Sequence, residues 1–545
     1  MSNYVLQRLK GYQPIPGPVA CVVMDGVGIG LRDESDGVHM AHTPTLDRLF
    51  CDTLFTQLKA HGTAVGMPSD GDMGNSEVGH NALGLGRIIA QGAKLVQEAL
   101  TSDRLFEGET WKKLIEIGRG GATLHFIGLL SDGNVHSHID HLFALLDACA
   151  AASVERVRIH ALLDGRDVGA RTALTYLEPL ELKLSGLSAD GCDYRIASGG
   201  GRMITTMDRY NADWSVVERG WKAHVLGDAR GFGSATEAVQ AFYEEDPNVS
   251  DQYLDSFVVV EGGKAVGAIE DGDGVVCFNF RGDRAIELSQ AFEAEEFDRF
   301  DRQRKPDAFY CGMMQYDGDA KTPANFLVAS PAVSGSMGEY LCGTGLTSYA
   351  VSETQKYGHV TYFWNGNKSG YIDETLEEYV EIPSDKVMFD ERPWMKAAEI
   401  TDAAVAAIEG GAYQFIRLNY ANGDMVGHTG VRAAIRVAVE ALDLGLARLL
   451  AALEAAGGAV VILADHGNAD LMFTEVKGNR EPMVAHTLNP VPCIIKDYSD
   501  ANRWVLMDAE MDTPVALSNV AATLINLLGY EKPEEYDLSL IALKE

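Results

Sequence analysis

Short apolar runs alternate with longer segments of helical periodicity along most of the chain. Runs of this length, bounded by Gly, Pro or Asp, are typical of buried strands. We expect strands within residues 19–25, 122–132, 157–167, 194–202, 274–284, 414–424, 458–468 and 490–497. Apolar residues at three- and four-residue spacing predict a long crossover helix over 430–458. This alternation predicts an α/β fold.

Aspartate and histidine residues stand where several of these strands end: Asp25, Asp424, His428, Asp465, His466 and His486. Taken singly, such an aspartate is a turn former or helix N-cap, and such a histidine is a hydrogen-bonded residue. In open α/β sheets, however, ligands bind beyond the carboxyl ends of the strands. Together the six side chains suit two divalent cations. Imidazole with carboxylate favours manganese, cobalt or zinc over calcium, and magnesium is a further candidate.

Ser76 lies in the segment "GDMGNSEVGH", residues 71–80, where no histidine base is adjacent. On its own this segment reads as a Gly/Asn turn, and it does not match the G-x-S-x-G elbow of esterases. A serine hydroxyl needs a base, a lowered pKa or a metal to act as a nucleophile. Two cations about 3.5–4 Å apart would supply this activation and hold a phosphoryl group beside it.

Arginines gather in Gly- and Asp-rich segments in the middle of the chain. Guanidinium groups bind carboxylate and phosphate through two parallel hydrogen bonds, so these segments predict an anion site. The candidates are His136, Arg166, Asp167, Arg202, Arg209, Arg281 and Arg284. Lys356, further along, is a compact charge suited to a phosphoryl oxygen or a leaving alkoxide.

The 545 residues include 45 Lys and Arg against 79 Asp and Glu, a formal net charge of −34. This acidity argues against nucleic acid or anionic membranes as general partners. The eight cysteines form no C-x-x-C pair, which favours a reducing compartment without a cysteine zinc site. With no long apolar run, we expect a cytoplasmic protein of two or more domains. Charged, turn-rich stretches at 244–253 and 270–275 predict surface loops.

A series of motifs in fixed order resembles the cofactor-independent (2,3-bisphosphoglycerate-independent) phosphoglycerate mutases of the alkaline phosphatase superfamily. The resemblance covers nearly the whole chain, from Asp25 to "TLINLLGY". The motifs are "MDGVGIG", "GDMGNSEVGHNALGLGR", "SDGNVHSH", "DGRDV", "GGGRM", "NFRGDR", "SETQKYGHVTYFWNG", "NGDMVGHTG", "ADHGN" and "AHT".

The resemblance implies an alkaline-phosphatase-like metal-binding domain built from both chain ends, residues 1–90 and 331–545, with an α/β phosphotransferase domain inserted at 91–330. It also implies roles for the candidate residues. One metal would be held by Asp424, His428 and His486, and the other by Asp25, Ser76, Asp465 and His466. Ser76 would become phosphoserine. Arg281, Arg284 and Lys356 would bind the phosphoryl group. The glycerate would be bound by His136, Arg166, Asp167, Arg202 and Arg209, with Asp167 as acid and base.

The activity implied is the interconversion of 3-phosphoglycerate and 2-phosphoglycerate in glycolysis and gluconeogenesis. Two divalent metals per chain are expected, with manganese favoured over cobalt and magnesium, and the chain is expected to act as a monomer. Two other functions remain open: a phosphopentomutase or plain phosphomonoesterase, and a metal-bound protein without catalysis. The arginine set argues against the first, and the retained Ser76, Lys356 and metal ligands argue against the second.

Two features depart from the family pattern. Asn134 stands where the family usually has a second glycine, which is expected to alter that loop slightly without removing a functional group. The chain is also longer than typical bacterial members and resembles the longer plant and trypanosomatid types.

Overall fold

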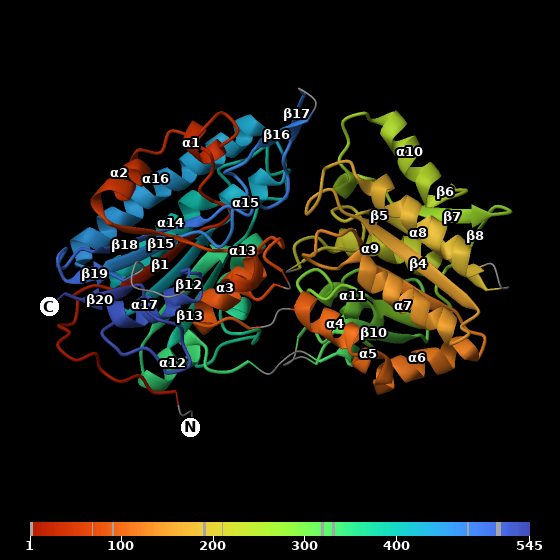
Figure 1. Ribbon diagram of the computed structural model, residues 1–545, viewed down its shortest axis with the longest axis horizontal. Helices are drawn as coiled ribbons and strands as arrows, with labels where there is room; N and C mark the ends of the chain where they lie inside the picture. Colours follow the sequence, from red (N-terminus) through yellow and green to blue (C-terminus); the bar gives the residue numbers. More distant parts are fainter. Residues whose placement is uncertain are drawn as a thin grey trace. The chain divides into compact units, whose positions relative to one another are not determined.

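The computed structural model describes residues 4–67, 69–89, 92–188, 192–209, 211–317, 321–329, 333–476, 479–507 and 514–544. The chain folds into two compact units (Figure 1). Unit 1 comprises Met1–Ala90 and Ala332–Glu545, and unit 2 comprises Gln91–Pro331. The domain boundaries predicted at 90/91 and 330/331 fall on residues outside those described.

Unit 1 is built on a seven-stranded sheet with the order β13-β12-β14-β1-β15-β18-β2. The five strands from β13 to β15 are parallel, and β18 and β2 are added antiparallel. The strands predicted within 19–25, 414–424, 458–468 and 490–497 are confirmed. The sheet strands are β1 (Val19–Met24), β2 (Leu54–Leu58), β12 (Ser348–Glu353), β13 (Glu377–Ile382), β14 (Phe415–Tyr420), β15 (Ala459–Leu463) and β18 (Val491–Asp497).

Helices cover both faces of this sheet (Figure 1). The predicted crossover helix is α16, Arg432–Ala456, and it ends at Gly457, whose φ of 66° is a left-handed conformation that glycine adopts without strain. Helix α14, Ala397–Gly410, packs against α16. The other helical elements of unit 1 are α1 (Gly37–Met40), α2 (Pro44–Asp52), η1 (Gly62–Val65), α3 (Ser76–Leu85), α12 (Met337–Thr344), α13 (Thr354–Gly358), η5 (His359–Phe363), α15 (Asn422–Gly427) and α17 (Asn519–Leu527). Unit 1 also has two antiparallel two-stranded sheets: β16 (Phe473–Val476) with β17 (Asn479–Pro482), and β19 (Trp504–Leu506) with β20 (Ile541–Leu543).

Unit 2 has its own nine-stranded sheet with the order β11-β10-β9-β3-β4-β5-β7-β6, and β8 pairs with β7. The six strands from β11 to β5 are parallel. The sheet comprises β3 (Leu124–Leu130), β4 (Arg156–Leu163), β5 (Asp193–Gly201), β6 (Arg230–Phe232), β7 (Phe257–Glu261), β8 (Lys264–Ala265), β9 (Gly274–Cys277), β10 (Phe309–Met314) and β11 (Phe326–Val328). Its helices are α4 (Gly92–Thr101), α5 (Arg104–Glu107), α6 (Glu109–Arg119), α7 (Ile139–Ala151), α8 (Ala173–Leu187), α9 (Trp214–Trp221), η3 (Lys222–Leu226), α10 (Ala235–Glu245), η4 (Asp251–Tyr253) and α11 (Ile286–Glu293).

The two stretches predicted as surface loops each contain a buried aspartate, so this prediction is wrong at those positions. Asp251 accepts hydrogen bonds from the backbone N–H groups of Thr172 and Ala173. Asp273 accepts from the backbone N–H of Thr123 and contacts a histidine. Charge density alone misplaces them, because a buried carboxylate is tolerated when hydrogen-bond donors surround it.

The parallel strands of each unit bring their carboxyl ends to one edge of the sheet. In unit 1 the segments after β1, β12, β14 and β15 meet there, and in unit 2 those after β3, β4, β5 and β9 do so. These segments hold most of the predicted site residues. No helix within the described residues is long and apolar enough to cross a membrane.

Candidate active site

Ser76 is the first residue of helix α3 and is buried. The preceding Asn75 caps the helix by accepting a hydrogen bond from the backbone N–H of Val78. Ser76 Oγ lies 3.0 Å from His466 Nε2 and 3.3 Å from Asp25 Oδ1. The hydroxyl thus lies at the positive end of a helix, in contact with Asp25, Lys356 and His466 from three other parts of the chain.

Lys356 lies in α13, just after strand β12, and its side chain is buried. Its ammonium group donates to Asp25 Oδ1 at 2.8 Å and to Asp424 Oδ2 at 2.7 Å. It also donates to Ser76 Oγ. The lysine therefore connects the serine with the two strand-end carboxylates of β1 and β14.

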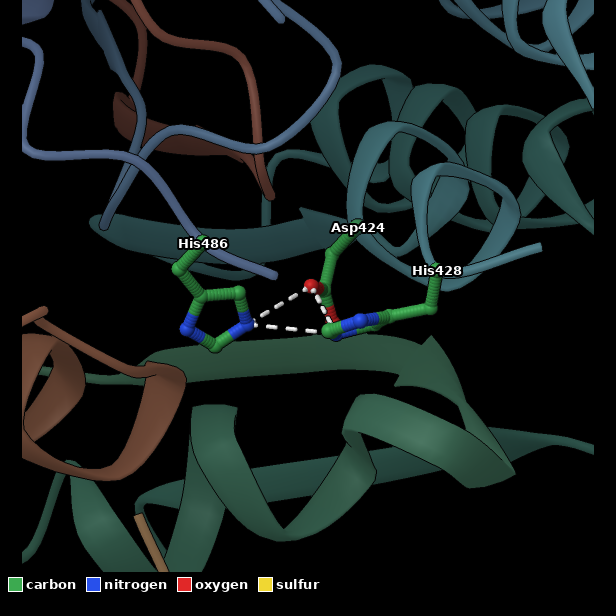
Figure 2. A group of neighbouring side chains, drawn as sticks. All are labelled: Asp424, His428 and His486. Atoms are coloured by element: carbon green, nitrogen blue, oxygen red, sulfur yellow. Dashed lines mark hydrogen bonds and ion pairs between the residues drawn. The ribbon is translucent and has the colours of Figure 1, made fainter. Parts of the chain in front are cut away.

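Asp424, His428 and His486 form one compact group (Figure 2). His428 Nε2 lies 2.9 Å and His486 Nε2 lies 3.2 Å from Asp424 Oδ1, and the two Nε2 atoms are 3.2 Å apart. The other ring nitrogens face backbone carbonyls. His428 Nδ1 is 2.6 Å from the oxygen of Val484, and His486 Nδ1 is 2.8 Å from that of Gly74.

These carbonyl contacts fix the chemistry of the group. A carbonyl only accepts, so each Nδ1 carries the proton and each Nε2 presents a lone pair. Two lone pairs and a carboxylate oxygen, all within 4.8 Å of one another, repel unless a cation lies between them. Histidines that ligate metals are oriented by the same type of hydrogen bond from the second ring nitrogen. The group therefore fits a divalent cation.

Asp25, Ser76, Asp465 and His466 are also brought together, around the carboxyl ends of β1 and β15. His466 Nε2 lies 3.4 Å from Asp25 Oδ1 and 3.7 Å from Asp465 Oδ2. Asp25 and His466 combine with Asp424 in a second group of closely spaced ligand atoms. Burial lowers the pKa of His466 to about 3, so the ring is neutral and able to ligate a metal.

The charges of this region do not balance by themselves. Asp25, Asp424 and Asp465 are fully or almost fully buried, and Lys356 forms ion pairs with Asp25 and Asp424. Burial, followed by the charge of Asp465, raises the pKa of Asp25 to about 7. A surplus of buried carboxylate is the electrostatic setting in which divalent cations bind.

Two residues outside the predicted set support these side chains. Asn419, on β14, donates to Asp25 Oδ2 at 2.8 Å. His80, one turn along α3 from Ser76, lies 3.4 Å from Asp465 Oδ2. The only available sequence signal was a polar residue inside a predicted buried strand and a histidine four residues after the serine. Neither distinguishes a supporting role from a structural one.

In unit 2, Asp164 organises the segment after β4 and was missed as a site residue. Its Oδ1 accepts from the backbone N–H of Arg166 at 3.1 Å and from that of Asp167 at 3.0 Å. The same oxygen accepts from Arg202 Nη1 at 2.9 Å. Arg202 Nη1 also donates to Asp167 Oδ2. The segments after β4 and β5 are thereby joined by buried ion pairs. The signal for Asp164 was its position directly after a strand.

Asp283, between the two arginines of "NFRGDR", has a similar role. Arg281 Nε lies 3.0 Å from Asp283 Oδ1 and Arg209 Nη1 lies 3.3 Å from Asp283 Oδ2. His136 Nδ1 is 3.6 Å from Oδ1 of the same carboxylate. All the predicted arginines of the middle segment, with His136 and Asp167, are buried in unit 2.

The guanidinium group of Arg284 lies close to those of three other buried arginines. Its Nη1 donates to the backbone oxygen of Met207 at 2.6 Å, whereas Nε and Nη2 have no hydrogen-bond partner among the residues described. Burial and the charges of Arg209, Arg166 and Arg202 hold the pKa of Arg284 well below its usual range. The guanidinium nitrogens of Arg284 that lack a partner among the described residues are therefore suited to an anionic ligand.

The departure at Asn134 has a structural reason. Asn134 has a φ of 56°, in the left-handed region that glycine adopts most readily. Asparagine is one of the few other residues that occupies this region routinely. The substitution therefore preserves the backbone path of the loop that precedes His136.

The fold and the two clusters define an α/β enzyme of phosphoryl transfer, with a buried serine beside metal-type ligands and a separate arginine cluster. Residues 96–318 match the family described as "BPG-independent PGAM N-terminus". The chain is 53% identical to the 2,3-bisphosphoglycerate-independent phosphoglycerate mutase of Trypanosoma brucei brucei, over 95% of this chain and 96% of that protein. It is 49% identical to a probable 2,3-bisphosphoglycerate-independent phosphoglycerate mutase 2 of Arabidopsis thaliana, over 100% of this chain and 99% of that one.

A solved structure of Leishmania mexicana phosphoglycerate mutase, determined at low cobalt concentration, superposes with a TM-score of 0.96 at 50% identity. The match covers 99% of this chain and 100% of that one. The chain belongs to the family of the 2,3-bisphosphoglycerate-independent phosphoglycerate mutases. The predicted fold class is confirmed as an α/β protein built from both chain ends with an inserted α/β domain.

Proposed function

We propose that this protein interconverts 3-phosphoglycerate and 2-phosphoglycerate through a phosphoserine at Ser76, with two divalent cations and without a bisphosphoglycerate cofactor. The observation that carries the proposal is the contact of Ser76 Oγ with Lys356, Asp25 and His466 in one buried site. The full-length similarity to mutases of this family supports the substrate assignment. The reaction would serve glycolysis and gluconeogenesis.

The cation ligands fall into two sets. Asp424, His428 and His486 would hold one cation, and Asp25, Asp465 and His466, together with Ser76, would hold the other. Cations bound there would lower the pKa of the Ser76 hydroxyl and offset the charge of the phosphoryl oxygens. The mixed carboxylate and imidazole donors favour manganese, with cobalt or magnesium as alternatives.

The chain's own residues account for the first half-reaction. Ser76 Oγ attacks phosphorus, and the bond from phosphorus to the glycerate oxygen breaks. Lys356 Nζ, which donates to Ser76 Oγ, stabilises negative charge on that oxygen. The backbone N–H groups at the start of α3 favour the phosphate that forms on Ser76.

The second half-reaction needs the glycerate to stay bound while the other hydroxyl attacks. His136, Arg166, Arg202 and Arg209 would bind the glycerate, and Arg281 and Arg284 would bind the phosphoryl group. Asp167 would donate a proton to the departing oxygen and then take one from the attacking hydroxyl. Arg202, which donates to Asp167 Oδ2, orients the carboxyl group for this exchange.

A plain phosphomonoesterase is the main alternative, because the serine and metal-type ligands alone suffice for hydrolysis. The arginine cluster of unit 2 favours the mutase, since water is the acceptor in hydrolysis and needs no clamp for a small acid. The deciding assay follows conversion of 3-phosphoglycerate after metal removal and manganese add-back, with and without 2,3-bisphosphoglycerate. We expect activity that returns with the metal and is independent of the cofactor. Full activity in a verified metal-free sample would refute the metal-dependent mechanism, and release of phosphate alone would favour the esterase.

A further inference from the structure

A continuous series of hydrogen-bonded, buried side chains, which we call the hydrogen-bonded chain, crosses the sheet of unit 2. It does not include the arginine cluster. It starts at Asp273, whose Oδ2 lies 3.2 Å from His125 Nε2. His125 Nδ1 lies 2.9 Å from His160 Nε2, and His160 Nδ1 lies 2.6 Å from Ser198 Oγ. Asp273 precedes β9, and the next three residues lie on β3, β4 and β5, which are adjacent strands in this order.

The hydrogen-bonded chain continues from the sheet to a turn. Ser198 Oγ lies 2.7 Å from His224 Nδ1, and His224 Nε2 lies 2.8 Å from Thr206 Oγ1. His224 belongs to η3, a short π-helix that directly follows α9. Such π-helical turns occur frequently at functional sites. The hydrogen-bonded chain therefore begins at the carboxylate of Asp273 and ends at the hydroxyl of Thr206.

The carboxylate end allows one arrangement of protons when the rings are neutral. Asp273 accepts from backbone N–H groups of Thr123 and Glu270, and as a carboxylate it also accepts from His125 Nε2–H. His125 Nδ1 must then accept from His160 Nε2–H, so His160 Nδ1 accepts from the hydroxyl of Ser198.

The same logic fixes the second half of the chain. Ser198 Oγ has used its proton and accepts from His224 Nδ1–H, so His224 Nε2 accepts from the hydroxyl of Thr206. Burial supports the neutral form of every ring. It lowers the pKa of His125, takes that of His160 well below its usual value and brings that of His224 to about 3.

The backbone conformation of Thr206 is strained and must be held in place by neighbouring contacts. Its φ is 73°, in the left-handed region that β-branched residues adopt only under strain. It belongs to the turn that leads from Arg202 to Arg209, and a side chain on Gly220 would collide with Thr206 Oγ1. Such strained conformations persist only when the surroundings over-determine them. The hydrogen bond to His224 is one such constraint.

We propose that His224 and Thr206 are positioning residues of the mutase: the one-directional chain from Asp273 holds the turn that presents Arg202 and Arg209 to the glycerate. This inference rests on the proposed function, because the role of these two arginines in glycerate binding is part of that proposal. The histidines carry no proton to the substrate. They keep one arrangement of hydrogen bonds, and thereby one backbone conformation at Thr206.

The first test is independent of activity. In protein labelled with ¹⁵N-histidine, long-range ¹H–¹⁵N spectra at neutral pH identify which ring nitrogen carries the proton, and single histidine variants assign the signals. The expected result is Nε2–H for His125 and His160 and the rarer Nδ1–H form for His224. A doubly protonated ring, or Nε2–H at His224, overturns the proposal.

The second test compares Thr206→Val, which removes the hydroxyl but keeps the shape, with Thr206→Ser, which keeps the hydroxyl. We expect Thr206→Val to raise the KM for 3-phosphoglycerate about tenfold, a loss of about 1.4 kcal/mol, with a smaller change in kcat. Thr206→Ser should stay within about twofold of wild type. Ser289→Ala removes another buried hydroxyl of unit 2, hydrogen-bonded to Tyr310, and controls for a general loss of stability.

Arg202→Lys separates failure of this inference from failure of the proposed function. If Arg202→Lys raises KM but Thr206→Val, shown folded by circular dichroism, does not, the positioning role is wrong and the glycerate assignment stands. If neither variant changes KM, the assignment of the arginines is wrong and the inference fails with it. A rise in KM for Ser289→Ala equal to that for Thr206→Val also overturns the specific role.

Discussion

His428 Nε2 and His486 Nε2 lie 3.2 Å apart, and each ring directs its other nitrogen at a backbone carbonyl. Both Nε2 atoms therefore present lone pairs to the same point, beside Asp424 Oδ1. A cation bound between these atoms would offset the repulsion between the two lone pairs and the carboxylate oxygen.

This relationship predicts how loss of a single ring affects metal binding. His486→Ala should weaken manganese binding at this position by at least about 100-fold, because one of the three ligands is lost. Mutation of a residue that only hydrogen-bonds to a metal ligand already lowers metal affinity by about 10–100-fold. Mutase activity should fall in parallel and recover partly at high manganese concentration. Titration calorimetry on metal-free protein measures the affinity. His39→Ala, at an exposed histidine of unit 1, is the control. Equal affinity for the wild type and His486→Ala would contradict the assignment.

The buried arginines of "NFRGDR" lead to a second prediction. Arg281→Lys or Arg284→Lys keeps the charge but loses the planar fork that binds a phosphoryl group through two hydrogen bonds. We expect kcat/KM to fall at least about tenfold in either variant, in steady-state assays with 3-phosphoglycerate. Arg230→Lys, at an exposed ion pair with Glu245, should leave the kinetics unchanged. Wild-type kinetics in both cluster variants would exclude the phosphoryl-binding role.

The third prediction concerns retention of the glycerate. Arg166→Ala or Asp167→Asn should shift the outcome from transfer towards hydrolysis, because a phosphoserine left without bound glycerate is open to water. The ratio of inorganic phosphate released to 2-phosphoglycerate formed should rise several-fold over the wild type. Enzyme-coupled detection and a phosphate assay measure both products in one reaction. If both rates fall while their ratio stays constant, these residues do not retain the intermediate.

Glu287 provides a prediction about pH and stability. Burial and the neighbouring charge of Asp208 raise its pKa from 4.5 to about 8. The unfolded chain releases this proton near its ordinary pKa, so between about pH 4.5 and 8 the folded state binds more protons. The contribution of Glu287 to stability is therefore present at low pH and is lost as the pH rises through this window.

Glu287→Gln removes the titration while keeping an acceptor for the backbone N–H of Asn211. The melting temperature of Glu287→Gln minus that of the wild type should increase from pH 5 to pH 8. About 1 kcal/mol corresponds to 2–4 °C in a unit of this size. Glu245→Gln, at an exposed carboxylate of the same unit, is the control. A difference that is constant or decreases with pH would contradict the raised pKa.

The sequence was sufficient for eight of the sheet strands, β1, β3, β4, β5, β9, β14, β15 and β18, and for the chemistry-bearing residues at their ends. Continuous apolar runs such as 19–24 can be buried only inside a covered sheet, and parallel strands bring Asp25, Asp424 and Asp465 to one edge whatever the details of packing. The sequence also indicated that Asn134 keeps the function of its loop. The left-handed φ of this residue, which both glycine and asparagine adopt, gives the structural reason.

The sequence could not predict the buried aspartates that pair with histidines and arginines of unit 2, because neither their spacing nor their position along the chain distinguishes them from surface residues. Asp273 stands in a charged, glycine-rich stretch and reads as a surface residue, yet its carboxylate is buried against His125. Asp164 and Asp283 look like turn formers until the arginines that they hold are placed in space. The cytoplasmic location, the monomeric state and the identity of the metal stay predictions.

The central claim is that Ser76 carries the phosphoryl group between the two positions of the glycerate. The direct measurement is to quench the manganese-loaded wild type with acid during turnover of 3-phosphoglycerate and map phosphate by mass spectrometry. The account predicts phosphate on the peptide containing Ser76. It also predicts that Ser76→Ala yields no phosphopeptide and no turnover, with a melting temperature close to wild type because a single hydroxyl at the start of α3 contributes little stability. Phosphate on another residue, or near wild-type mutase activity in Ser76→Ala, would contradict it.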